Sequence, residues 1–293
     1  MKKRTKLLIC TAFLLLALGV TLYPLVSNVA GEKYRSLVET RYEKAVEKLG
    51  TMDLIAEKEA AVSYNVMLRG IQQKAFTKSA LEEAEESYDS LLNVRRDGIM
   101  GYVQIPKISV ELPIYHGTSE ETLDRGVGHL LGSSLPVGGI GTHCVLTGHS
   151  GLAGTRMFSD LDQLEKGDVF YLKVLDETHA YMILDINKVL PEDTSLLGID
   201  PDRDSCTLVT CTPFSVNTHR LLMRGERIEY SMARQIVEET EITEEPAKST
   251  WTQEYLKGIG FGCLGIAALS ALFLTAHYLY GAGKSKRGRH ERA

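Results

Sequence analysis

Two long apolar stretches near the ends of the chain limit what the rest of it can fold into. Residues 7–26 (LLICTAFLLLALGVTLYPLV) follow a basic N-terminus, and residues 258–281 (GIGFGCLGIAALSALFLTAHYLYG) precede a basic C-terminal tail. Each stretch is long enough to cross about 30 Å of hydrocarbon at ~1.5 Å per residue. Because positive flanks mark the cytoplasmic side of a membrane, we expect both termini inside the cell and residues 30–254 outside.

The first apolar stretch has an alternative interpretation as a cleaved signal peptide, which also combines a basic start with an apolar core. Cleavage would follow Ala30 and would leave Asn28 at a position that favours a small residue. In the interpretation with two membrane spans, residues 1–30 form a cytoplasmic start and an anchor. Residues 258–281 then form a second transmembrane helix, and residues 282–293 form a basic cytoplasmic tail.

Cysteine usage becomes informative once the middle of the chain is placed outside the cell. Of the five cysteines, Cys10 and Cys263 lie within the apolar stretches, which leaves Cys144, Cys206 and Cys211. Exported domains that depend on disulfides normally carry an even number of cysteines. At least one thiol is therefore free, and a free thiol is either buried and inert or exposed for its chemistry.

Composition changes along the outer region. Residues 31–97 are rich in Glu, Lys and Ala with apolar residues at helical spacing, which predicts two or three helices or a helical hairpin. Residues 233–257 are acidic and mostly polar, which predicts a linker back to the membrane.

The whole chain is 44% hydrophobic and 24% charged with a net charge of −5, as in ordinary globular proteins. We expect no cofactor, no metal and no nucleic-acid partner.

Residues 98–232 have the texture of strands and turns. Short β-branched and aromatic segments alternate with Pro, Gly, Asn and Asp, which predicts a mainly β domain built as a barrel or a sandwich. One short helix is expected at residues 160–166. The predicted strands are MGYVQI (100–105), VELPIYH (110–116), HCVLTGH (143–149), DVFYLKVL (168–175), AYMILDINKVL (180–190), SCTLVTCT (205–212) and HRLLMRGERIEY (219–230).

Alternation along residues 205–212 separates the two nearby cysteines. Cys206 faces one side of the predicted strand and Cys211 the other, and five residues of strand hold them about 17 Å apart. That separation is far beyond the ~7 Å between Cα atoms that a disulfide allows. Cys211 also ends the strand just before Pro213, where the chain turns outward. We interpret Cys211 as the candidate reactive thiol, and Cys206 and Cys144 as core thiols.

Four histidines of the outer domain are candidates for a partner of Cys211. His149 follows a predicted strand at a glycine-flanked turn, so two strands that end at the same rim would bring it near Cys211. The other three, His116, His143 and His219, have weaker positional arguments, since a lone histidine is more often a structural hydrogen-bonding group. A thiolate beside an imidazole is a nucleophile whose partner protonates the leaving amine.

Attack of a thiolate on an amide creates an oxyanion that needs a fixed positive donor. Arg220 follows Cys211 by nine residues and carries a permanent charge on a planar fork of donors. Arg224 shares its strand face, and Arg220 is preferred because it is nearer the loop. A zinc site is disfavoured because the cysteines and histidines have no CxxC spacing. A serine hydrolase is disfavoured because GHSGL (148–152) misplaces the second glycine of G-x-S-x-G.

These residues resemble a known family. TLVTC (207–211) followed by NTHRLLMRG (217–225), with LTGHSG (146–151) upstream, is similar to the sortases, and most of all to the pilus-assembling class C sortases of Gram-positive bacteria. The resemblance covers residues 97–230. Further matching stretches are RDGIMGYVQIPKI (96–108), LPIYHGTS (112–119), GHLLGSSLPVGG (128–139) and VLPEDTSLL (189–197).

The resemblance implies an eight-stranded β-barrel with short helices and a catalytic set of His149, Cys211 and Arg220. It implies cleavage of an LPxTG-like sorting signal between Thr and Gly, with a thioester on Cys211. The acyl group would then pass to a lysine amine of a pilin subunit. Thr210 falls at the family position whose backbone lines the oxyanion site.

The resemblance leaves two rival functions and one departure. The rivals are a sortase that anchors surface proteins to a cell-wall precursor, and an inactive membrane-tethered binding module. The departure is in residues 64–94, which correspond to the lid that closes class C sortases. This stretch lacks the Asp-Pro of the family motif, although Phe76 supplies an aromatic residue as a possible plug.

Overall fold

The computed structural model describes residues 3–72, 87–151, 156–243 and 249–266, together with residues 268 and 275. The chain divides into two compact units, Met1–Ser249 and Thr250–Ala293. In the second unit, residues 250–266 are helical. Of the helices within these described ranges, none combines the length and the apolar character needed to cross a membrane.

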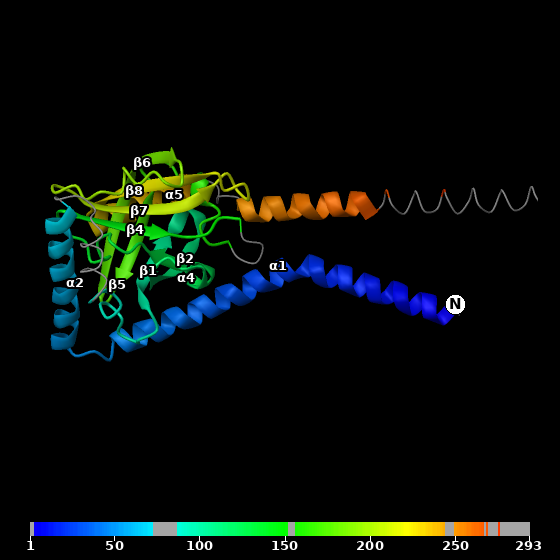
Figure 1. Ribbon diagram of the computed structural model, residues 1–293, viewed down its shortest axis with the longest axis horizontal. Coiled ribbons are helices and arrows are strands. Elements are labelled where there is room, and N and C mark those ends of the chain that lie inside the picture. Colours follow the sequence, from blue (N-terminus) through cyan, green and yellow to red (C-terminus); the bar gives the residue numbers. More distant parts are fainter. Residues whose placement is uncertain are drawn as a thin grey trace, which may run out of the picture. The chain divides into compact units, whose positions relative to one another are not determined.

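The first unit is built around a closed β-barrel (Figure 1). Its strands follow each other around the barrel in the order β1, β2, β3, β4, β7, β8, β6 and β5. All seven predicted strands are present, and the barrel alternative is confirmed over the sandwich. The strands are β1 (Ile99–Ile105), β2 (Val110–His116), β3 (Val127–His129), β4 (Thr142–Thr147), β5 (Val169–Val174), β6 (Glu177–Val189), β7 (Asp204–Thr212) and β8 (His219–Ile228).

The sheet is mixed because two neighbouring pairs run parallel. The strands β2 and β3 pair in parallel, and so do β4 and β7, whereas the other pairs are antiparallel. Residues 117–126 connect β2 to β3, and β4 is joined to β7 through β5 and β6, because parallel neighbours need a crossover connection. The parallel pairing of β4 with β7 has a direct consequence for function, since both strands end at the same rim of the barrel.

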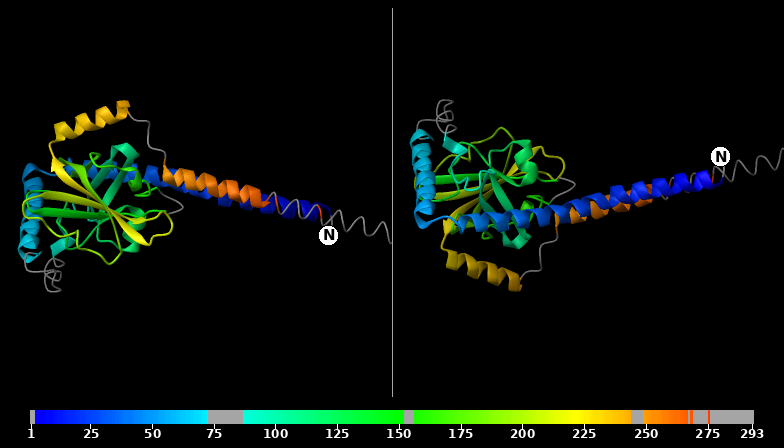
Figure 2. Two further views of the ribbon diagram at one scale, coloured as in Figure 1. Left: turned by 90° about the horizontal axis from the view of Figure 1, so that it is seen from above. Right: turned by 90° about the horizontal axis from the view of Figure 1, so that it is seen from below.

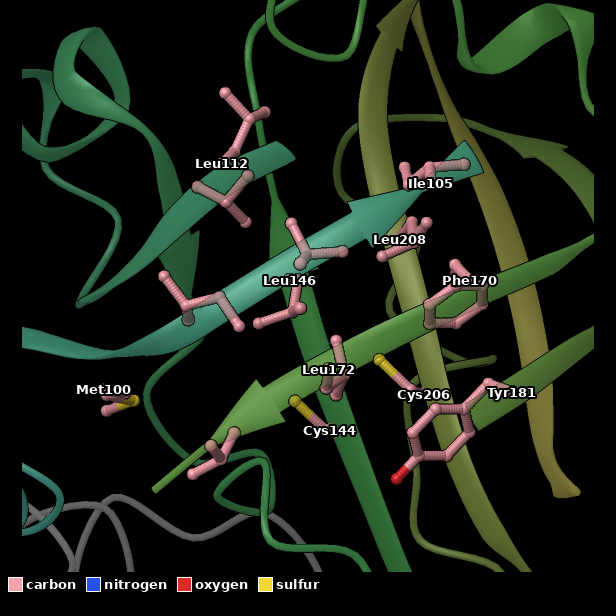
Figure 3. Packing of buried hydrophobic residues seen from close by; sticks show 14 of the residues in the cluster. Met100, Ile105, Leu112, Cys144, Leu146, Phe170, Leu172, Tyr181, Cys206 and Leu208 are labelled. Carbon is pink, nitrogen blue, oxygen red and sulfur yellow. The ribbon is translucent and has the colours of Figure 1, made fainter. Parts of the chain in front are cut away.

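The barrel interior is filled by alternate side chains of its strands, as period-two alternation dictates. Figure 3 shows this packing, with Cys144 and Cys206 lying beside Leu172 and Tyr181. The rings of Phe170 and Tyr181 stack with their centroids 5.5 Å apart. Gly225 on β8 makes room for them, because a Cβ atom there would lie 2.7 Å from Cε1 of Phe170.

Two helices precede the barrel, as predicted for residues 31–97. Helix α1 (Lys3–Val46) packs its C-terminal part on β1, where the hydroxyl of Tyr42 donates to the carbonyl oxygen of Met100 at 2.9 Å. Helix α2 (Thr51–Gln72) lies beside the barrel (Figure 1), and its Asn65 side chain forms two hydrogen bonds with the backbone of Leu135.

Short helical segments occupy three of the connections. They are α4 (Glu120–Arg125) between β2 and β3, and the 3-10 turns η1 (Pro106–Ile108) and η2 (Leu161–Gln163). The predicted helix at residues 160–166 is therefore reduced to a single 3-10 turn. Phe76, the possible lid plug, lies in residues 73–86, outside the described residues.

The interpretation of residues 233–257 as a linker is wrong at its beginning. Helix α5 (Tyr230–Thr243) follows β8 directly and lies on the outside of the barrel (Figure 2). Its Ala233 is fully buried against Val169 and Tyr171 of β5, with Ile236 packed beside them. Two of the acidic residues that suggested a linker, Glu238 and Glu239, are exposed on the solvent-facing side of this amphipathic helix.

Candidate active site

Strand β7 presents Cys211 at the rim of the barrel. The alternation expected from the sequence is confirmed, since Cys206 and Leu208 point into the core, whereas Val209 packs in a separate cluster on the outer face. Cys211 lies on that outer face and is partly exposed. The strand ends one residue later, at Thr212, because the following Pro213 has no N–H to continue the ladder.

The register of the neighbouring strands brings the three predicted site residues to one level of the barrel. Arg220 on β8 is the Cα partner of Cys211 in the antiparallel ladder. On the other side, Thr147 of β4 is the partner of Val209 in the parallel ladder. His149 follows Thr147 by two residues, as Cys211 follows Val209, so the continued register places His149 opposite Cys211.

Two hydrogen bonds extend the pairing of β4 with β7 beyond the end of β4. The Gly148 amide donates to the carbonyl oxygen of Val209 at 3.0 Å, and the Thr210 hydroxyl donates to the carbonyl oxygen of Gly148 at 2.8 Å. These bonds fix Gly148, the residue before His149, to the two residues before Cys211. Thr210 is buried with its side chain turned inward, so its side chain supports this geometry. The role of its backbone in an oxyanion site stays a prediction.

The loops on either side of this row touch each other. A Cβ atom on Gly151 would lie 2.9 Å from the backbone nitrogen of Ser215, and Gly151 has a φ of +81° that favours glycine. The chain after His149 is thereby packed against the turn between β7 and β8. Arg220 contacts the same turn, since its Nη1 donates to the carbonyl oxygen of Asn217 at 3.4 Å and to that of His219 at 3.2 Å.

His149 has an acidic neighbour that the sequence did not indicate. Its Nε2 lies 3.9 Å from Oδ1 of Asp124 on helix α4. The carboxylate is largely exposed, so water screens its interaction with the imidazole. Because α4 was not predicted as a helix, and because its position depends on the pairing of β2 with β3, no local sequence signal pointed to Asp124.

The other three candidate histidines lie outside the row of the site. His116 contacts two carbonyl oxygens, those of Gly98 and Leu91, and so holds the segment that leads into β1. His219 is the partner of Thr212 and lies one pair beyond the row of the site. His143 is fully buried on β4, where burial lowers its pKa to about 4.

The two remaining cysteines of the barrel are core residues, as predicted. Cys144 and Cys206 are Cα partners in the parallel ladder between β4 and β7, and both are buried free thiols. Burial raises the pKa of the Cys206 thiol well above its ordinary value. No cluster of three or more His, Cys, Asp or Glu side chains able to hold a metal occurs in the part of the chain that the structure describes.

Comparison with known proteins identifies the family to which this barrel belongs. Residues 103–228 match the family model of the sortase domain. The chain is 30% identical over 160 residues to sortase D of Bacillus subtilis (strain 168), a match that covers 54% of this chain and 77% of that protein. The chain therefore belongs to the sortase family, whose members are cysteine transpeptidases.

The similar solved structures include class C sortases. Sortase C1 from Streptococcus agalactiae is 42% identical with a TM-score of 0.61, and the match covers 66% of this chain and 98% of that one. Sortase C from Streptococcus pneumoniae is 38% identical with a TM-score of 0.57, and the match covers 66% and 97% of the two chains. The prediction of a sortase most like those of class C is confirmed.

Proposed function

We propose that Cys211 is the nucleophile of a transpeptidase that cleaves an LPxTG-like sorting signal between Thr and Gly. The observation that carries the proposal is the row formed by the ladder partners Cys211 and Arg220 and by His149 at the same level. The Cys211 thiolate attacks the carbonyl carbon of the Thr residue. The tetrahedral intermediate then loses the amine of the Gly residue, and a thioester on Cys211 is left.

His149 and Arg220 have distinct roles in this step. His149 donates a proton to the departing Gly amine, so that a neutral amine leaves. Arg220 donates to the developing oxyanion, and its planar fork of N–H groups suits an oxygen that gains charge. In the second half-reaction an amine attacks the thioester and gives one proton to His149, an amide bond forms, and the thiolate of Cys211 is released.

The proposed acceptor is the side-chain amine of a lysine in a pilin subunit, which yields an isopeptide-linked polymer. This choice is supported by the similarity to class C sortases, among them the pneumococcal enzyme whose structure was described in connection with pilin substrate specificity. The rival acceptor is an amine of a cell-wall precursor, which the same thioester would also serve.

We further propose that the apolar stretches at residues 7–26 and 258–281 anchor the enzyme in the membrane, with the barrel outside the cell. Their length and their basic flanks support this topology. Alkaline carbonate extraction of membranes from expressing cells tests the anchoring. Protease added outside intact cells tests the side, since it should degrade the barrel and leave a protected C-terminal tail.

The decisive experiment is mass spectrometry of the purified full chain mixed with an LPxTG peptide. We expect an acyl adduct on Cys211 that hydroxylamine removes, and no adduct on the Cys211→Ala variant. Adding a pilin-derived lysine peptide or a cross-bridge amine peptide then identifies the acceptor from the product that forms. A chain that forms no adduct with any sorting peptide would instead support an inactive binding module.

A further inference from the structure

The connection between β6 and β7, residues 190–203, lies beside the outer face that carries the active-site row. Its Leu197 packs against a small apolar cluster formed by Val145, Val209 and Leu222. Two members of this cluster adjoin the site, since Val209 precedes Cys211 by two residues and Leu222 follows Arg220 by two. An extended peptide that reaches Cys211 along this face therefore meets the β6–β7 connection.

The same connection offers apolar side chains to such a peptide. Leu190 is 51% exposed and Leu196 is 38% exposed. Local hydrogen bonds fold the connection into turns. The amide of Asp193 donates to the carbonyl oxygen of Leu190, and the amide of Leu197 donates to the carbonyl oxygen of Thr194. These turns shape the connection, but they do not attach it to the barrel.

His143 supplies an attachment. Its Nδ1 lies 2.9 Å from the carbonyl oxygen of Gly198, a residue 55 positions away in the middle of the connection. Its Nε2 lies 2.7 Å from Oγ1 of Thr207 on β7. A carbonyl oxygen only accepts, so Nδ1 carries the proton and Nε2 accepts from the hydroxyl of Thr207. A neutral imidazole with this tautomer satisfies both contacts.

We infer that His143 is a positioning residue that holds the β6–β7 connection against the barrel through Gly198. The connection held in this way forms one wall of the path along which the sorting signal reaches Cys211. The inference rests on the proposed role of Cys211 as the nucleophile. His143 touches neither substrate nor the reacting atoms, because it is fully buried beneath the connection.

The attachment is insensitive to pH in the range in which such an enzyme works. Burial, and then the nearby positive charge of Arg224, lower the pKa of His143 to about 4. The side chain therefore stays neutral above pH 5, and the tautomer that joins Gly198 to Thr207 persists. A change in peptide affinity between pH 6 and 8 must then come from other groups.

The test compares three replacements of His143 in the purified full chain. His143→Leu fills much of the space but loses the donor to Gly198. His143→Gln moves its amide toward the Nε2 position, and His143→Asn keeps an amide donor near the Nδ1 position. We expect KM for an LPxTG peptide to rise about tenfold in the Leu and Gln variants with kcat changed less than threefold, and the Asn variant to restore KM.

A matched control separates attachment from general stability. Thr207→Val removes the other hydrogen bond of His143 and leaves the contact with Gly198 in place. We expect Thr207→Val to lower thermal stability while KM stays within twofold of the wild type. Hydrogen exchange at residues 190–199 should accelerate in His143→Leu and not in Thr207→Val, and alkylation of Cys211 by iodoacetamide should proceed at one rate in all variants.

The outcomes divide cleanly. An unchanged KM in His143→Leu, or an equal rise in Thr207→Val, would overturn the inference. If the wild type forms no thioester, the proposed function is wrong, and the exchange measurement still decides whether His143 holds the connection. If exchange at residues 190–199 is the same in His143→Leu and the wild type, His143 does not hold it.

Discussion

The two faces of strand β7 carry the same thiol group in two different settings. On the inner face Cys206 is fully buried against Cys144, and burial keeps it protonated by raising its pKa. On the outer face Cys211 is partly exposed at the end of the strand, opposite Arg220. The strand face and the position along the strand, rather than the residue type, therefore decide which thiol is available for chemistry.

The strongest test of the difference between the two faces of β7 removes each thiol in turn, beginning with Cys211 on the outer face. Cys211→Ala should lower the rate of sorting-peptide cleavage by about 10⁴-fold or more, because no other nucleophile lies in the row. Its thermal stability should stay close to that of the wild type, since the side chain is only partly buried. Cleavage is followed by chromatography of the peptide products and stability by calorimetry.

The control for this variant is iodoacetamide labelling of the folded wild type. The label should appear on Cys211 and not on Cys144 or Cys206 until the chain is unfolded. Labelling of a core thiol at a rate similar to that of Cys211 would show that the inner face is open to solvent, and the contrast between the two faces would fail.

The next prediction concerns the charge that distinguishes the outer face. Arg220→Gln should lower kcat for peptide cleavage by about 10²- to 10³-fold, as expected when one donor to an oxyanion is lost. The rate of Cys211 alkylation should change far less, because a small alkyl halide forms no oxyanion. Arg224→Gln is the matched control, since Arg224 lies on the same face four pairs further from the rim and contacts Ser205. Equal losses in both variants would contradict a specific role for Arg220.

Much of this contrast could be predicted from the sequence because it depends on local alternation. The pattern of residues 205–212 placed Cys206 and Cys211 on opposite faces, and proline marked the end of the strand. The partner His149 was selected by its glycine-flanked turn. The position of His149 opposite Cys211, however, is set by the parallel register of β4 and β7, which no local pattern encodes.

Other features escaped sequence reasoning for identifiable physical reasons. Strand β3 has three residues, Val127–His129, too few to show alternation, and it is stabilised by its two neighbouring strands. Helix α5 was mistaken for a linker because its acidic face outweighs the few apolar residues that contact β5. His143 was considered for catalysis, whereas its actual contacts are with Gly198 and Thr207, which are distant in sequence.

Buried histidines make the stability of the barrel depend on pH. Burial is the main cause that lowers the pKa of both His143 and His179 to about 4. The positive charge of Arg224 lowers the pKa of His143 further. For His179, Arg227 and Lys58 lower the pKa further and Glu177 opposes them. The unfolded chain, with an ordinary histidine pKa near 6.5, binds more protons between pH 6.5 and 4. The free energy of unfolding therefore falls as the pH decreases through this window, by about 2 kcal/mol per histidine between pH 7 and 5.

Urea unfolding of the full chain at pH 7 and pH 5 measures this dependence. In His143→Asn the difference between the two pH values should shrink by about 2 kcal/mol, because the contribution of His143 is gone. Val145→Ala provides the control, since Val145 is a buried side chain of the same strand that does not titrate, and its truncation should lower the free energy of unfolding equally at both pH values. If His143→Asn unfolds with the same pH dependence as the wild type, His143 does not titrate as its burial implies.

The smallest expected effect comes from the inner face. Cys206→Ala should lower the free energy of unfolding by about 1 kcal/mol, since it removes one buried sulfur and leaves a small cavity. Peptide cleavage by this variant should continue at the wild-type rate. Cys144→Ala should behave alike, and the double variant should cost less than the sum of the two, because the thiols are in contact and share one site. A strictly additive double variant would mean that the two thiols do not interact. A loss of cleavage in either single variant, with the chain still folded, would mean that the inner face reaches the chemistry after all, and the division of β7 into a structural and a reactive face would have to be abandoned.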